Sequence, residues 1–281
     1  MEEYEDKLLY KEVLEMKNIK VEYSWLKNSA ITGVNQLPEH SEHYYFDKYV
    51  DINHFDYFQI DKIHLNSNWT YMKSDFNEKN GDDESTLVTL FNHFKGEDKL
   101  ITKNIILKMQ SLNLPVYIWM NGCFVGFSKG LEQTIEFEIT NLLCLEENEL
   151  IIKVCSIEEE KQNNNVMLDS ILEKISESII YSIPKLHVYD FNAVLENSKN
   201  INKSTLSIDC LLSGYSDSAI ISVYIYDKEK NIVFKENIDY TNKLEKKYDL
   251  DINYLEISFV ELLIIDDGTI VETAITKVKT V

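Results

Sequence analysis

An Asn-Gly pair, Asn121-Gly122, lies between two runs of alternating apolar residues, 115–120 and 124–128. Both central residues of a type I′ turn need positive φ, and Asn-Gly adopts it readily, so this pattern is the strongest short signal for a β-hairpin. Residues 101–107 and 150–154 alternate in the same way. The chain is therefore predicted to fold mainly into antiparallel strands with one buried face.

The C-terminal third carries short alternating runs at even spacing, and Asp267-Gly268 predicts another tight hairpin there. Six or seven such strands are typical of an immunoglobulin-like β-sandwich. Pro184 restricts its own backbone and that of the preceding residue, which predicts a domain boundary at residues 182–184. The expected domains are residues 1–184 and 185–281. The strands predicted in the second domain are residues 187–194, 205–212, 219–226, 232–239, 255–265 and 270–278.

Two helices interrupt this β pattern. A short one is predicted at residues 6–16. A second, at residues 166–178 with Asn165 as its N-cap, follows from apolar residues at helical spacing, namely Leu168, Ile171, Leu172, Ile175 and Ile179. This second helix either covers an edge of the first sandwich or forms an interface with a partner or a second copy. The polar residues 78–85 predict a surface loop.

Composition excludes several classes of partner. The chain has 281 residues, 44% of them hydrophobic, and a formal net charge of −20. Nucleic acids and anionic membranes both bind clustered cations, so neither is expected as a partner. All cationic side chains are lysine, which removes the bidentate clamps that arginine forms with phosphate.

We expect a soluble, cytoplasmic protein. No run approaches the roughly 18 apolar residues of a membrane span, and the acidic N-terminus does not look like a secretory or transit signal. The cysteines show no Cys-x-x-Cys spacing and are expected to be reduced and buried: Cys123, Cys144, Cys155 and Cys210.

The hairpin also resembles the sugar-binding domain that opens glycoside hydrolase family 2 enzymes of the β-galactosidase kind. That domain carries Trp-x-Asn-Gly-x-x-Val-Gly-[Tyr/Phe]-Ser, then Glu-Phe-[Asp/Glu]-[Ile/Val]-Thr and Glu-Asn-x-Leu. The matching residues here are 119–128, 136–140 and 147–150. Residues 46–69 resemble a further family segment that ends in Ser-Asn-Trp, with Phe55 at a usual tryptophan and Asn66 at a usual proline. Residues 186–191 and 262–279 resemble the start and end of the family's second domain.

The resemblance implies a jelly-roll (galactose-binding-like) sandwich followed by an immunoglobulin-like β-sandwich, without the (β/α)₈ barrel. In that family the paired catalytic glutamates sit on the barrel, about 5 Å apart. Two jelly-roll loops also reach the family's active site, and the residues after Trp69 and Val154 match neither of them. We therefore predict no catalytic residue and no hydrolysis by this chain on its own.

Other candidate residues have simpler interpretations. Trp69 and Trp119 could stack on a sugar, but the resemblance assigns them mainly to the structure of the domain. Asn121 is predicted to be a turn residue. Ser85, Ser128 and Ser156 lack the Gly-x-Ser-x-Gly setting of a hydrolase nucleophile, and no Gly-rich phosphate loop occurs.

A metal site is not predicted either, although acidic residues and histidines gather between residues 39 and 64. The spacing His40-x-x-His43 matches no familiar zinc site. The aspartates of this stretch and of residues 82–84 show no calcium-binding register. Chance surface residues explain the group better: His40, His43, His54, His64, Glu39, Glu42, Asp47, Asp51, Asp56 and Asp61. No cofactor is expected.

Three functions remain open. The first is a non-catalytic β-galactosidase-like protein that binds carbohydrate or takes part in protein assembly. The second is a subunit of a split glycoside hydrolase whose barrel is separately encoded, and the third is a scaffold without a ligand. Carbohydrate binding predicts an exposed aromatic on a concave face of the first domain, so burial of Trp69, Tyr71 and Trp119 counts against it. Scaffolding predicts a homo-oligomer whose interface includes the second helix.

Overall fold

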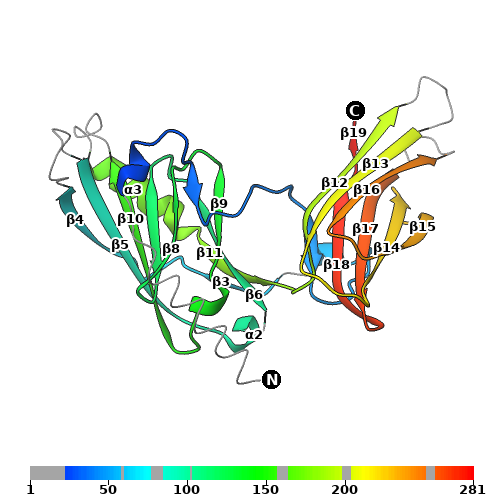
Figure 1. Cartoon of the computed structure of the whole chain (residues 1–281), viewed down its shortest axis with the longest axis horizontal. Helices are drawn as coiled ribbons and strands as arrows, with labels where there is room; N and C mark the ends of the chain where they lie inside the picture. Colours follow the sequence, from blue (N-terminus) through cyan, green and yellow to red (C-terminus); the bar gives the residue numbers. More distant parts are fainter. Residues whose placement is uncertain are drawn as a thin grey trace. The chain divides into compact units, whose positions relative to one another are not determined.

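The computed structural model describes residues 23–57, 60–76, 85–101, 103–156, 164–197, 204–250 and 257–281 (Figure 1). The helix predicted at residues 6–16 and nearly all of the loop predicted at 78–85 lie outside these ranges. The chain forms two compact units, one of residues 1–39 and 61–182 and the other of residues 40–60 and 183–281. Nearly all regular structure described in both units is β-strand, as predicted.

The first unit is a sandwich of two antiparallel sheets, the jelly-roll arrangement that was expected. The larger sheet has the order β1-β8-β7-β10-β5-β4 and contains β1 (Gly33–Val34), β4 (Thr70–Phe76), β5 (Ser85–Lys95), β7 (Val116–Met120), β8 (Cys123–Ser128) and β10 (Glu147–Ser156). The smaller has the order β3-β11-β6-β9 and contains β3 (Lys62–His64), β6 (Asn104–Gln110), β9 (Thr134–Glu138) and β11 (Ile179–Ile183). Their facing side chains, such as Leu90, Leu107 and Ile152, form one buried core.

Among the described residues of the first unit, four helical segments accompany these sheets. They are η1 (Tyr23–Leu26), α2 (Asp98–Ile101), η3 (Thr140–Leu142) and α3 (Asn164–Ser176). Residue 101, predicted as the start of a strand, instead ends α2. No helix among the described residues is long and apolar enough to cross a membrane.

The central hairpin forms as predicted. Met120 pairs with Cys123 across the turn, where Asn121 and Gly122 have φ of 51° and 76°. Gly126 in β8 has a different role. A Cβ there would lie 2.4 Å from the ring of Phe137, so glycine allows that ring to pack against the strand.

Helix α3 corrects the prediction in two details. It begins at Asn164, so Asn165 lies inside the helix and is not its N-cap, and Ile179 belongs to β11. The apolar residues Leu168, Ile171 and Ile175 are buried in the core of the first unit. The apolar face is therefore used within the unit, which favours the covering role over an interface.

The substitution Ile175→Val tests this assignment. Ile175 is fully buried, and removing one methylene from a packed core should lower the free energy of unfolding by about 1 kcal/mol. Urea denaturation measures this loss. Light scattering should show an unchanged mass, as for the exposed control Ile232→Val. A changed mass in the Ile175 variant alone would contradict the covering role.

The second unit packs two sheets in the immunoglobulin-like manner that was predicted. One sheet has the order β16-β13-β12-β19, from β12 (His187–Asn197), β13 (Ser204–Ser213), β16 (Lys243–Leu250) and β19 (Lys279–Thr280). The other has the order β15-β14-β17-β18-β2, from β2 (Tyr44–Phe46), β14 (Ile220–Asp227), β15 (Ile232–Asp239), β17 (Ile257–Asp266) and β18 (Thr269–Lys277). Asp267 and Gly268 form the predicted β17–β18 turn with positive φ.

Strand β16 was not predicted because a lysine interrupts its alternation. Leu244, Tyr248 and Leu250 are buried, but Lys246 stands between them on the same side of the strand. Its ammonium lies 3.3 Å from a carboxylate oxygen of Glu236. An ion-paired lysine therefore occupies a position where the alternating pattern calls for an apolar residue.

Residues 40–60 belong to the second unit, whereas the predicted division placed them in the first. β2 pairs with β18, with Phe46 opposite Thr273. The following residues cover the outer face of this five-stranded sheet, where Val50, Ile52 and Phe55 pack with Tyr226 and Ile275. The short helix η2 (Phe55–Tyr57) ends this cover. We call residues 47–55, which follow β2, the strap.

Candidate functional site

The side chains of Asn121 and Asn148, from the family-like motifs at residues 119–128 and 147–150, form a hydrogen bond. The Asn121 side-chain amide donates to Asn148 Oδ1 at 2.9 Å and to the Leu142 carbonyl at 2.7 Å, while its oxygen accepts the Glu149 N–H at 2.8 Å. Asn148 is only 1% exposed and also bonds the backbone of Cys144 and Glu146. These amides therefore close the hairpin against the loop before β10 and are not free for a ligand.

The Ser-Asn-Trp motif is also built into the fold. Asn92 donates to the Ser67 carbonyl at 2.6 Å, and the Trp69 indole N–H donates to the Leu65 carbonyl at 2.6 Å. Asn68 takes the turn position with φ of 65°. β4 begins at the next residue, Thr70.

Trp119 lies in an aromatic cluster on the outward face of the six-stranded sheet. Its ring packs with Tyr117 and Phe124, and Trp25 from η1 stacks on Tyr117 with the ring centroids 6.3 Å apart. The Lys153 ammonium lies 5.0 Å from the centroid of Trp119. This half-buried indole is thus occupied by a cation–π contact that a sugar would have to displace.

Tyr71 is the predicted candidate that stays accessible. It pairs with Leu90, a core residue, so Tyr71 lies on the inward face of the sheet. β4 is the edge strand, which explains why the side chain is nevertheless 51% exposed. The half-buried Trp69 packs against the same core two residues earlier. Together they present aromatic surface at the β4 edge.

The histidines considered for a metal site belong to different units of the fold. His64 lies in β3 of the first unit, whereas His40, His43 and His54 belong to the second. Within the described residues, no three His, Cys, Asp or Glu side chains gather as a metal would require. His43 Nε2 instead donates to the Val188 carbonyl at 2.9 Å, and burial, assisted by nearby His187, lowers the pKa of His43.

Sequence reasoning missed two buried glutamates in the second unit. Glu272 accepts hydrogen bonds from His187 Nδ1 at 2.6 Å and from the Val188 N–H at 2.7 Å. Glu261 accepts one from the Tyr226 hydroxyl at 2.6 Å. Each glutamate interrupts an apolar run, which is the sequence signal that could have revealed them.

These two carboxyl groups do not form a catalytic pair. Glu261 pairs with Ile275 across β17 and β18, so it shares the outer face with that residue. Glu272 lies three residues before Ile275 and therefore faces the opposite side, toward the interior of the sandwich. A sheet separates the two groups, whereas retaining glycosidases need both beside one sugar.

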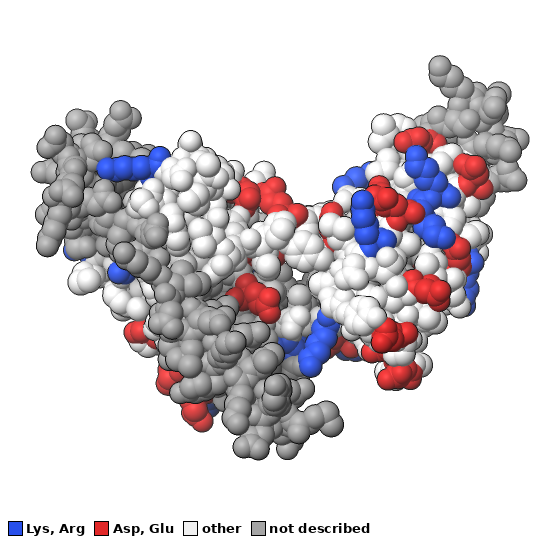
Figure 2. All heavy atoms as spheres, viewed as in Figure 1, with Lys and Arg blue, Asp and Glu red and all other residues white. Residues whose placement is uncertain are grey.

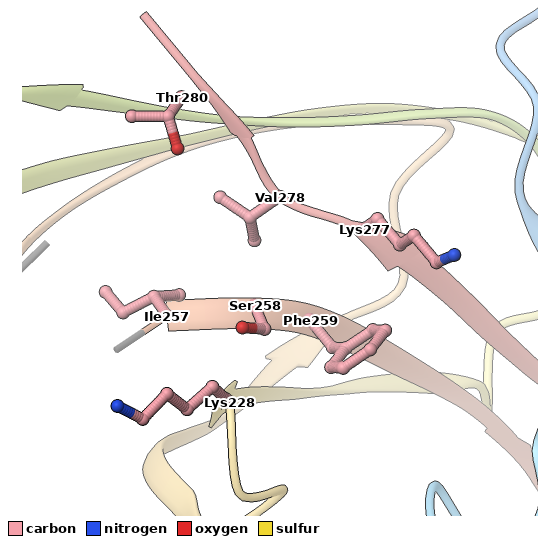
Figure 3. Close-up of a pocket in the computed structure, with 7 residues that line it drawn as sticks. All are labelled: Lys228, Ile257, Ser258, Phe259, Lys277, Val278 and Thr280. Carbon is pink, nitrogen blue, oxygen red and sulfur yellow. The ribbon is translucent and has the colours of Figure 1, made fainter. Parts of the chain in front are cut away.

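A pocket of about 690 Å³ lies at one end of the second unit (Figure 3). Its lining comes from the start of β17, the end of β18, the residues that follow β18 and the β14–β15 turn: Lys228, Ile257, Ser258, Phe259, Lys277, Val278 and Thr280. Figure 3 shows the ammonium groups of Lys228 and Lys277 pointing away from each other at opposite ends. These lysines do not converge on one anion.

The cysteines and the surface charges show no further site on the residues described. All four thiols are free; Cys123, Cys155 and Cys210 are buried as predicted, but Cys144 is exposed. On the face shown in Figure 2, the second unit carries lysines and carboxylates interspersed, with no stripe of one sign.

Comparison with known proteins supports the resemblance. No family model matches the chain. The β-galactosidase of Clostridium acetobutylicum is 23% identical over 285 residues, covering 82% of this chain and 31% of that enzyme. The β-galactosidase of Halalkalibacterium halodurans is 21% identical over 212 residues, covering 70% of this chain and 20% of that enzyme. The chain thus spans less than a third of these relatives.

Solved structures show the same fold. A β-glucuronidase of Bifidobacterium dentium matches with a TM-score of 0.53 at 13% identity, covering 68% of this chain and 39% of that one. A β-glucuronidase described as belonging to glycoside hydrolase family 2 also has a TM-score of 0.53 at 13% identity, covering 78% and 30%. The chain is therefore a homologue of part of the bacterial β-galactosidases and shares the β-sandwich fold of part of glycoside hydrolase family 2 enzymes.

Proposed function

We propose that this chain forms a non-catalytic binding module whose ligand is carbohydrate. The observation that carries the proposal is the half-exposed Tyr71 beside Trp69 at the β4 edge. Aromatic rings with one open face bury the apolar side of a pyranose while the sugar hydroxyls stay in water. The sugar-binding name of the resembled domain and the sequence relatives point to the same ligand class.

The non-catalytic half of the proposal has separate support. In the resembled family the catalytic carboxylates sit on the barrel, and this chain spans 31% or less of the relatives considered. The two buried glutamates, Glu261 and Glu272, lie on opposite faces of their sheet. The residues after Trp69 and Val154 also do not match the two loops that reach the resembled family's active site.

Replacing Tyr71 tests the binding site. Tyr71→Ala removes the exposed ring, and the affinity for a bound galactoside should fall about tenfold, the size expected for a lost aromatic contact. Isothermal titration of wild type and variant measures the loss. Tyr215→Ala is the matched control, since Tyr215 is 75% exposed in the second unit. An equal loss in both variants, or none in either, would refute a site at the β4 edge.

A split glycoside hydrolase is the second candidate. It is favoured by the identity of the relatives, which are β-galactosidases of which this chain covers one part. The test mixes the chain with a β-galactosidase that lacks the corresponding region. Restored hydrolysis would establish a complementing subunit, whereas unchanged activity would leave the binding module as the explanation.

A further inference from the structure

The strap covers the outer face of the five-stranded sheet, and the side chain of Thr273 in β18 bonds its backbone. The buried Thr273 hydroxyl donates to the Lys48 carbonyl at 2.8 Å and accepts the Val50 N–H at 3.2 Å. Val50, Ile52 and Phe55 supply apolar contacts to the sheet. The other face of this sheet belongs to a separate core cluster that includes Val223 and Leu262. The strap can therefore lift without opening the interior of the sandwich.

Glu261 lies beneath this cover. On the neighbouring strands it stands opposite Tyr224 and Ile275, and it is only 2% exposed. Its Oε2 accepts the Tyr226 hydroxyl at 2.6 Å, while Oε1 has no hydrogen-bond partner among the described residues. An ionised carboxylate with an unpaired oxygen is costly in such a place, whereas the protonated acid is not.

The groups around Glu261 favour the neutral form. The pKa of Glu261 is raised to about 7: burial is the main cause, the Tyr226 hydroxyl acts in the opposite direction, and the charge of Asp51 on the strap adds to the rise. Burial and, after it, the charge of Glu261 raise the pKa of Tyr49 on the strap. Lysines nearby are engaged with rings: Lys235 from β15 lies over Tyr224, and Lys230 lies over Phe55 and Phe259.

We propose that the strap is a pH-controlled element, packed on the sheet while Glu261 carries a proton and released when the carboxylate ionises. The proton passes to solvent. The carboxylate then gains water only if the strap lifts, because residues of the strap pack over the strands beside it. Release uncovers the outer face of β14, β17 and β18 near neutral pH.

Hydrogen exchange at the strap tests the proposal. Exchange of the strap amides, Val50 included, is compared between wild type and Glu261→Gln at each pH, which cancels the intrinsic dependence of exchange on pH. The pKa of Glu261 is about 7 with the strap closed and takes its ordinary value of 4.5 with the strap open. The ratio of wild-type to variant exchange rates should therefore rise on the order of 30-fold between pH 5.5 and 8.5. A ratio that stays constant overturns the proposal.

Two further variants keep the test decisive even if Glu261→Gln does not fold. Tyr226→Phe removes the hydrogen bond that favours the carboxylate, so the midpoint of release should move to higher pH. Thr273→Val removes the fastening hydroxyl and should speed strap exchange by the same factor at every pH. An unmoved midpoint in Tyr226→Phe, or equal loss of protection in the inner-core amides of β14 and β17, would refute a local, Glu261-controlled release.

Discussion

Replacing Asn148 with alanine should lower the free energy of unfolding by about 3 to 5 kcal/mol. The side chain makes four hydrogen bonds: it accepts from Asn121 Nδ2 and the Cys144 N–H, and it donates to the carbonyls of Cys144 and Glu146. Alanine removes all four hydrogen bonds of a side chain that is only 1% exposed, and each such bond contributes about 1 kcal/mol.

The loss should appear in the unfolding transition of the first unit, followed by urea denaturation with separate probes for the two units. Asn231→Ala is the matched control. Asn231 is exposed in the β14–β15 turn, and its side chain bonds Asp227 alone among the described residues, so its removal should cost well under 1 kcal/mol. Equal costs for the two variants would contradict the central role of Asn148 in joining the hairpin to β10.

Replacing Glu261 with glutamine should make the free energy of unfolding less sensitive to rising pH. Burial raises the pKa of Glu261 to about 7 from an ordinary 4.5. A group whose pKa is raised by folding contributes stability that is complete below pH 4.5 and is lost as the pH rises to about 7. The difference between these values converts to about 3 kcal/mol.

Glutamine does not ionise, so the free energy of unfolding of Glu261→Gln relative to wild type should rise between pH 4.5 and pH 8, by at most about 3 kcal/mol because release of the strap returns the wild-type carboxylate to water. Urea denaturation at a series of pH values measures this rise. Glu229→Gln, an exposed change in the β14–β15 turn, should keep the wild-type profile. A parallel profile for Glu261→Gln would show that this carboxyl group is not strained in the folded state.

Local features of the fold were predictable from sequence because the physics behind them is local. A two-residue turn needs positive φ at adjacent positions, and Asn121-Gly122 and Asp267-Gly268 both form it. The helical spacing of the apolar residues around Ile171 and Ile175 likewise predicts a helix with one buried face, and both residues are buried. Helix ends are less well marked, and the predicted cap at Asn165 was wrong.

Long-range pairings could not be read in the same way. Phe46 meets Thr273 across most of the chain, and His187 meets Glu272 from another strand, so no short pattern reveals either contact. The exposure of Tyr71 has a similar origin. Its side chain points inward with Leu90, and only the position of β4 at the sheet edge leaves it accessible.

The most direct measurement titrates the purified chain with a panel of β-galactosides and β-glucuronides while assaying release of the free sugar. The account predicts saturable binding of at least one glycoside, weakened by Tyr71→Ala, with no sugar released above the blank. Release of sugar that depends on the purified chain would contradict its non-catalytic character, and absence of binding across the panel would contradict carbohydrate as its ligand.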